Sequence, residues 1–162
     1  MAHYFDRIDR SKLYPAFADK VEACLDACAA RGALFVVTSG LRTVEEQDAL
    51  YAKGRTSPGG IVTKARGGYS AHNYGCGVDA CRDSDPGKDG LQPTYDASKY
   101  AILGEEAPKV SLEWGGSWTS IKDLPHLQLP LKSFGLGWDV LLALYRKGGL
   151  PAVWARLDQV HW

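Results

Sequence analysis

The stretch Ser-Ala-His-Asn-Tyr-Gly-Cys-Gly-Val-Asp, residues 70–79, decides how the rest of the chain is interpreted. It places His72 and Asp79 seven positions apart across a turn that contains Gly75 and Gly77. An imidazole nitrogen and a carboxylate oxygen are both good zinc ligands, at distances of about 2.0–2.2 Å. Two ligands do not make a site, so a third ligand has to come from another part of the chain.

The third candidate ligand is His126, in the segment Asp-Leu-Pro-His-Leu-Gln at residues 123–128. Asp123 precedes this histidine by three positions. Ligation by His72, Asp79 and His126 would leave one position of a tetrahedral zinc ion open to water. Such an open position separates a catalytic zinc site from a structural one.

Two other histidines occur in the chain, and both lie close to its ends, His3 in an N-terminal arm and His161 beside the last residue. A lone histidine on a strand is more often structural than a ligand. His72 and His126 each lie near an acidic residue in a recognisable motif, and this favours metal binding at both positions.

The cysteine pattern predicts free thiols. Cys24 and Cys28 are one helical turn apart, Cys76 and Cys81 flank Asp79, and no Cys-x-x-Cys pair occurs, so a four-thiolate zinc site is not expected. Strand alternation places Cys81 on the same face as Asp79, which leaves Cys81 open as a further ligand. A cysteine nucleophile is disfavoured because no separate histidine partner remains for it.

The two motifs, Ser-x-His-x-x-Gly-x-x-x-Asp followed by Asp-x-x-His, resemble the zinc peptidases that cut peptidoglycan stem peptides. That family comprises D,D-peptidases and L-alanyl-D-glutamate peptidases, many of the latter being phage endolysins. The resemblance to the endolysin branch extends over about residues 38–128 and includes Ser39–Thr43, Gln47, Gly54–Thr56, Trp114–Gly116 and Trp118.

One departure from the family pattern lies between the first two ligands. The family usually has alanine where this chain has Gly77. We expect the loss of one methyl group to loosen the strand slightly, without affecting a ligand.

The resemblance implies a general base beside the metal. Asp123 would take a proton from the attacking water and pass it to the leaving amine. Glu113 is the alternative base, although a surface position at a strand edge is the preferred interpretation of that residue.

Arg42 is expected at a corner between a strand and a helix, next to the helix N-terminus, where the helix dipole disfavours a cation. One interpretation is a surface pair with Glu45 or Glu46. The other, which the resemblance favours, is a guanidinium that stabilises the developing oxyanion. The resemblance also suggests substrate contacts for Ser70, Trp114 and Trp118, although Ser70 could instead hold the turn and Trp114 could belong to the core.

Length and composition agree with one soluble globular domain. The chain has 162 residues, 45% of them apolar and 23% charged, and its formal net charge is zero. A nucleic-acid or membrane-inserted partner is therefore not indicated. We expect a single peptidase domain over residues 1–162, without a separate wall-binding domain, that acts as a monomer on peptidoglycan.

The expected fold class is α+β, with a small, largely antiparallel sheet that presents the zinc site between flanking helices, as in D,D-peptidases. A glycine-rich loop is expected at 54–69. Hydrophobic periodicity and capping signals predict helices and strands at these residues. The helices are 15–31, 43–54, 97–107, 136–146 and 151–157, and the strands are 33–37, 76–82 and 126–129.

The acidic segment 83–90 faintly resembles a calcium loop, but Gly87 stands at the third ligand position and no glutamate follows at the twelfth. A solvated acidic turn is the favoured interpretation, and a weak Ca²⁺ site is the alternative.

The sequence thus predicts a zinc metallopeptidase with one zinc ion per chain. The resemblance makes an L-alanyl-D-glutamate endopeptidase of the endolysin type the first choice. Such an enzyme is made in the host cytoplasm without a signal peptide and reaches the cell wall after release. The alternatives are a D-alanyl-D-alanine carboxypeptidase or dipeptidase, and a non-catalytic zinc-binding virion module.

Overall fold

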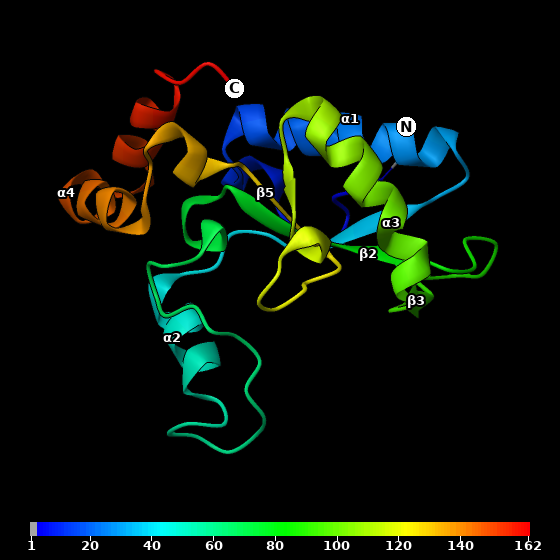
Figure 1. Ribbon diagram of the computed structural model, residues 1–162, viewed down its shortest axis with the longest axis horizontal. Coiled ribbons are helices and arrows are strands. Elements are labelled where there is room, and N and C mark those ends of the chain that lie inside the picture. The colour runs from blue at the N-terminus through cyan, green and yellow to red at the C-terminus, as the bar shows by residue number, and fades with distance from the viewer. Residues whose placement is uncertain (1–2) are drawn as a thin grey trace.

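The computed structural model describes residues 3–162 and is built around one small antiparallel sheet (Figure 1). The strands follow the order β1-β2-β5-β4, and β3 pairs with the far end of β2. The expected α+β class is confirmed. The strands are β1 Phe35–Ser39, β2 Gly77–Asp83, β3 Pro93–Thr94, β4 Glu113–Trp114 and β5 His126–Gln128.

Within residues 3–162, four α-helices accompany this sheet. Figure 1 shows α1 and α3 packed against each other along one side of the sheet, whereas α2 and the loop after it project from the other side. The last helix, α4, stands at the end of the sheet beside the turn that carries His72. The helices are α1 Pro15–Ala30, α2 Val44–Ala52, α3 Ala97–Glu106 and α4 Trp138–Leu157.

Helix α1 supplies the centre of the core. Pro15 occupies the first helical turn, where a backbone N–H has no acceptor within the helix, so proline costs the helix no hydrogen bond there. Phe17, Val21 and Leu25 then recur on one face and are fully buried. All four cysteines are free and buried, as their pattern predicts. Cys81 lies with its sulfur 3.6 Å from the hydroxyl of Tyr100, which places it against α3.

The expected element boundaries hold to within about two residues at most ends. Strand β1 begins at Phe35 and continues to Ser39, two residues beyond the expected end. The two helices expected at the C-terminus join into α4, and non-helical backbone at Gly148 and Gly149 marks the break between them. No helix of the described residues is long and apolar enough to cross a membrane.

The N-terminal arm that contains His3 packs closely against the rest of the structure. Residues 1–2 lie outside the described part. Tyr4 is 4% exposed, its hydroxyl donates to Asp26 on α1, and its carbonyl accepts from the Val37 amide at 2.8 Å. The arm therefore lies along β1 and contributes to the core.

The acidic segment after β2 forms a turn. One carboxylate oxygen of the buried Asp83 accepts hydrogen bonds from the amides of Asp85 and Gln92. Lys88 pairs with Asp85 at 3.2 Å. The chain-internal bonds of Asp83 agree with the favoured interpretation of this segment as an acidic turn.

Candidate metal centre

His72 is positioned by a single 3-10 turn, Ala71–Tyr74. The Ser70 hydroxyl accepts from the His72 amide at the start of this turn, and Gly75 ends it in the left-handed conformation with φ = 68°. The ring is nearly fully buried, and its Nδ1 lies 2.7 Å from the carbonyl oxygen of Gly40. A carbonyl only accepts, so Nδ1 carries the proton and Nε2 presents its lone pair.

Asp79 and His126 face each other on neighbouring strands. They are paired residues in the β2–β5 ladder, which brings a residue from the first motif beside one from the second. Oδ1 of Asp79 lies 3.4 Å from Nε2 of His72 and 3.3 Å from Nδ1 of His126. The two histidines therefore turn different ring nitrogens toward the same carboxylate.

A hydrogen-bond chain fixes the orientation of His126. Its Nε2 lies 2.9 Å from Oε1 of Gln128, and the Gln128 amide nitrogen donates to Glu113 at 3.0 Å. The Glu113 carboxylate accepts, so the Gln128 amide points its nitrogen toward Glu113 and its oxygen toward His126. This order assigns the ring proton to Nε2 and leaves the Nδ1 lone pair facing Asp79.

These three side chains fit a zinc ion. One ligand atom from each of His72, Asp79 and His126 lies within 4.8 Å of the other two, and the described residues gather no other group of this kind. Two neutral imidazoles and one carboxylate form a donor set that zinc prefers, and each imidazole has a partner that orients it. His72, Asp79 and His126 could therefore hold the metal, as the sequence predicts.

The charge of Asp79 depends on its neighbours. Burial acts to raise the pKa of the Asp79 carboxyl, but without a metal the neighbouring His126 and His72 rings outweigh burial when they carry a proton on the nitrogen that faces Asp79, and they hold that pKa well below its usual range. Asp79 is therefore an ionised carboxylate, the form that a divalent cation requires.

Arg42 lies beside this carboxylate. Its guanidinium donates to Gln47 at 2.8 Å and to Ser39 at 3.2 Å, and it lies 3.8 Å from Oδ2 of Asp79. Its backbone amide donates to the carbonyl of His72. Arg42 thus points into the site, and the described residues show no surface pair with Glu45 or Glu46.

Asp123 lines the same cleft from the loop before β5. Burial is the main cause that raises the pKa of its carboxyl, and the Asp79 carboxylate adds to this effect. Its side chain accepts no hydrogen bond from the described residues, whereas its backbone is fixed between Gly115 and His126. A carboxylate that has no protein partner and lies beside the metal ligands is available to a water molecule or a substrate.

The other predicted contact residues differ in position. Ser70 and Trp118 line the cleft, and the indole of Trp118 lies 5.1 Å from the His126 ring. Trp114 is not among the cleft-lining residues. Its indole donates to the carbonyl of Leu124 at 2.7 Å and packs on Gly116, so its place agrees with the core alternative.

Gly77 corrects the expectation of a looser strand. A Cβ at this position would lie 3.0 Å from the Cβ of Ala71 and 3.1 Å from the amide nitrogen of His72. The strand therefore passes very close to the turn that carries the first ligand. Glycine here permits a close approach and does not leave a gap.

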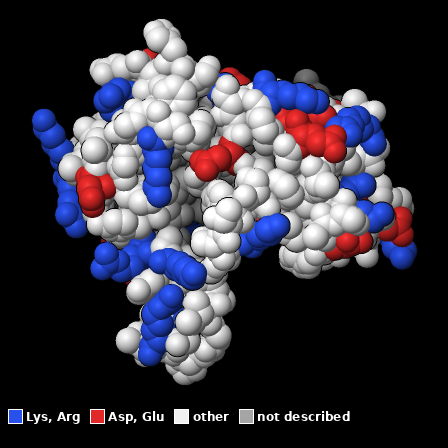
Figure 2. Space-filling view, in the orientation of Figure 1, with Lys and Arg blue, Asp and Glu red and all other residues white. Residues whose placement is uncertain are grey.

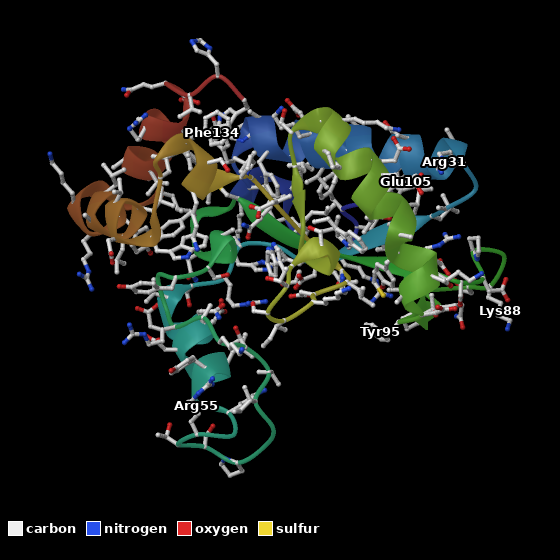
Figure 3. The ribbon with its side chains drawn as sticks, viewed as in Figure 1. Arg31, Arg55, Lys88, Tyr95, Glu105 and Phe134 are labelled. Atoms are coloured by element: carbon white, nitrogen blue, oxygen red, sulfur yellow. The ribbon has the colours of Figure 1, made fainter. Side chains whose placement is uncertain are left out.

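The cleft around these residues has a volume of about 900 Å³, near the upper end of the usual range for ligand-binding clefts. One wall is the loop after α2. This loop is tied down by Gln47, which donates to the carbonyl of Ala65 at 2.8 Å, and by Arg55, which donates to Thr63. Figure 3 labels Arg55 on the projecting loop.

Sequence reasoning missed the roles of Gln128 and Glu113 in orienting His126. Strand alternation offered a signal, because residues 126 and 128 share a face of β5. It also gave Gln47 no role, although this residue is buried at 1% exposure and contacts Arg42. A buried glutamine in a short helix is visible only once the loop that covers it is placed.

The fold and the site define a class, namely an α+β protein with an open cleft in which two histidines and a carboxylate are placed to hold a metal ion. A sequence profile of the D-alanyl-D-alanine carboxypeptidase family matches residues 63–129. The peptidoglycan L-alanyl-D-glutamate endopeptidase CwlK of Bacillus subtilis (strain 168) is 40% identical over 124 residues, which cover 74% of each chain. The chain therefore belongs to this family, the M15 peptidases, and is a metallopeptidase.

Solved structures show the same fold. The L-Ala D-Glu endopeptidase ChiX of Serratia marcescens aligns with a TM-score of 0.58 at 21% identity, over 83% of this chain and 92% of that one. The D,D-pentapeptidase VanY of a VanB-type resistance cassette, solved with Zn(II), aligns with a TM-score of 0.50 at 19% identity. That alignment covers 85% of this chain and 80% of VanY.

Proposed function

We propose that this protein is a zinc endopeptidase that cleaves the L-alanyl-D-glutamate bond of peptidoglycan stem peptides. The observation that carries the proposal is the 40% identity over 124 residues to CwlK, which is itself a peptidoglycan L-alanyl-D-glutamate endopeptidase. The gathered His72, Asp79 and His126 supply a metal-binding set for hydrolysis of a peptide bond.

A zinc ion held by these three residues would supply a Lewis acid and lower the pKa of a bound water to about 7. The chain supplies the remaining groups. Asp123 accepts the proton of the attacking water and later donates it to the leaving amine, a role for which its raised pKa and lack of a protein partner suit it.

Arg42 is the second proposed catalytic residue. Its guanidinium lies beside Asp79 and is held by Gln47 and Ser39, so it can donate to the carbonyl oxygen as negative charge develops there. Ser70 and Trp118 line the cleft, Ser70 at the start of the turn that carries His72 and Trp118 beside the ring of His126. We assign to both of them contacts with the bound peptide.

We further propose an endolysin role, in which the protein is made in the host cytoplasm, acts as a monomer and reaches the wall after release. The resemblance of Gly54–Thr56 and Trp114–Trp118 to the endolysin branch supports this role. Expression in a bacterial cytoplasm should lyse cells only when the inner membrane is permeabilised. Lysis without permeabilisation would contradict the proposed route.

A second candidate activity is D-alanyl-D-alanine carboxypeptidase, favoured by the family profile that matches residues 63–129. Digestion of purified sacculi decides between the two. New N-terminal D-glutamate, identified by mass spectrometry, supports the endopeptidase, whereas release of free D-alanine supports the carboxypeptidase. Release of neither, by protein that retains zinc, would favour a non-catalytic zinc-binding module.

A further inference from the structure

A second depression adjoins the cleft. It has a volume of about 440 Å³ and lies between the segment before His72 and helix α4. Tyr69 lines both this depression and the metal cleft, so the two are continuous at this side chain. None of the proposed catalytic groups lies in the depression.

Two arginines face the depression from opposite sides, Arg66 from the loop and Arg146 from α4. Neither forms an ion pair or donates a side-chain hydrogen bond to any of the residues described, 3–162, and the Arg66 guanidinium lies 5.2 Å from the Tyr69 ring. Figure 2 shows that Lys and Arg side chains predominate over α4 and α2, at the left and bottom of the molecule. The depression therefore offers two cations to a carboxylate.

Two carboxylates lie in the same depression. One oxygen of Asp48 accepts from the amide of Gly67 at 2.7 Å, and one oxygen of Asp139 accepts from the Tyr69 hydroxyl at 2.9 Å. These bonds fix both side chains. The second oxygen of each has no hydrogen-bond partner among the described residues, so each can accept from an ammonium group.

The depression also has an apolar part. Leu142 and Ala143 of α4 complete its lining between the charged groups. A ligand with a short methylene chain that ends in both an ammonium and a carboxylate would match the cations, the carboxylates and this apolar surface together.

The distance to the metal site suits a nearby residue of the same substrate. Tyr69 precedes His72 by three positions, so their Cα atoms are at most about 11 Å apart. An extended peptide advances about 3.3–3.6 Å for each residue. Because the intervening D-glutamate is linked through its γ-carboxyl and adds more chain atoms than an α-linked residue, the residue two positions beyond the cleaved bond begins at least about 7 Å from it, a distance comparable with the separation of Tyr69 from His72.

We propose that this depression is a subsite for the free amino-acid end of a diamino acid in the stem peptide, a carbon that carries both an ammonium and a carboxylate. Arg66 and Arg146 bind the carboxylate, and Asp48 and Asp139 accept from the ammonium. This inference rests on the proposed function, because it places the diamino acid after the D-glutamate that follows the cleaved bond.

The kinetic test compares two synthetic tripeptides, N-acetyl-L-Ala-γ-D-Glu followed by meso-diaminopimelate or by L-lysine. Lysine ends in an ammonium alone and lacks the terminal carboxylate. The wild-type enzyme should cleave the diaminopimelate peptide with a kcat/KM roughly fivefold to tenfold higher, mainly through KM. Arg66→Gln and Arg146→Gln should each reduce this ratio toward one. Lys147→Gln, an exposed neighbour that does not line the depression, should leave the ratio as it is in the wild type.

A binding test measures occupancy of the subsite without any catalytic step. Addition of free meso-diaminopimelate to the zinc-loaded protein should shift the amide resonances of Gly67 and Tyr69 in an NMR titration, and Arg146→Gln should weaken this response. Equal cleavage of the two peptides, or no shift at Gly67 and Tyr69, would overturn the subsite and leave the proposed function intact. Failure to cleave either peptide between alanine and glutamate would instead reject the proposed function, and the titration would still test the subsite.

Discussion

Oε1 of Gln128 lies 2.9 Å from Nε2 of His126, and the Gln128 amide nitrogen is held by Glu113 at 3.0 Å. This chain of hydrogen bonds leaves the other ring nitrogen of His126, Nδ1, facing Asp79. His72 is oriented by a backbone contact instead. Its Nδ1 donates to the carbonyl of Gly40, and its Nε2 therefore faces Asp79. The metal site therefore depends on residues that are not themselves ligands.

Replacing Gln128 by leucine should weaken zinc binding by about tenfold to a hundredfold, because His126 then loses the partner that sets its ring proton and orientation. Competition with a chromophoric chelator measures the zinc affinity. Glu113→Gln is the matched control, because a glutamine there can still accept from Gln128 and should change the affinity less. An unchanged zinc affinity in Gln128→Leu would contradict the orienting role.

Asp123→Asn should lower kcat by roughly 10²–10⁴-fold on isolated walls, the usual contribution of a positioned general base. The zinc content should remain at the wild-type level, since Asp123 is not one of the three gathered ligands. Metal analysis and wall turbidity, measured on the same preparation, check both parts. Wall digestion at the wild-type rate by a zinc-loaded Asp123→Asn protein would remove Asp123 from the mechanism.

Arg42→Met should reduce kcat/KM by about 10²–10³-fold, which corresponds to about 2.7–4 kcal/mol of transition-state stabilisation. Because Arg42 also contacts Asp79 and Gln47, the zinc content and the melting temperature of the variant need to be measured. Arg55→Met on the projecting loop serves as the control for loss of a cation, and it should reduce activity far less. A similar reduction in both variants would point to general electrostatics and not to Arg42.

Gly77→Ala should destabilise the protein by about 1–3 kcal/mol, because the added methyl would press on Ala71 and on the backbone of His72. Gly87→Ala is the control, since a Cβ there meets only Asp85 at 3.5 Å and surface substitutions of this kind usually stay within about 0.5 kcal/mol. Chemical denaturation of both variants measures the difference. Equal stability of Gly77→Ala and the wild type would show that the turn can yield.

Glu106 should make stability depend on pH. This buried carboxylate is paired first with Lys109 and also with Arg31, and both hold its pKa below the ordinary glutamate value. A carboxyl with a lowered folded-state pKa contributes stability above its unfolded pKa of about 4.3, and that contribution is lost as pH falls through the folded-state value. The wild type should therefore exceed Glu106→Gln in stability at pH 7, and the difference should shrink below about pH 4.

The control for Glu106 is its neighbour Glu105, which is exposed and pairs with Arg31 at 2.7 Å. Figure 3 labels both side chains, at the end of α1 and on α3. Glu105→Gln should change stability little at either pH, because exposed ion pairs contribute about 0–1 kcal/mol. Urea unfolding at pH 7 and pH 3 measures both variants. A Glu106→Gln difference that persists unchanged at pH 3 would show that the effect is not one of charge.

Much of the fold could be predicted from local signals. The capping box at Thr43 and Glu46 fixes the start of α2, and apolar periodicity marks α1. Motif spacing also predicted His72, Asp79 and His126 as a group, and the pairing of Asp79 with His126 across two strands explains why residues 47 positions apart meet. The helix predictions are confirmed because each depends on spacing within a short segment.

The remaining features depend on how the backbone folds back in three dimensions, which the residue spacing does not indicate. The close approach of Gly77 to Ala71 reversed the expectation of a looser strand. The place of Trp114 against Gly116, outside the cleft, follows from how one loop folds back on itself. The packed N-terminal arm requires β1 as its partner, because the Val37 amide binds the carbonyl of Tyr4.

The central claim is that His72, Asp79 and His126 hold one zinc ion that hydrolysis requires. The most direct measurement is the zinc content of pure protein together with its activity on isolated walls, before and after chelation, for the wild type and His72→Ala. We expect one zinc per wild-type chain, loss of activity on chelation with recovery on adding zinc, and neither zinc nor activity in His72→Ala. Full wall digestion by metal-free protein would contradict the claim.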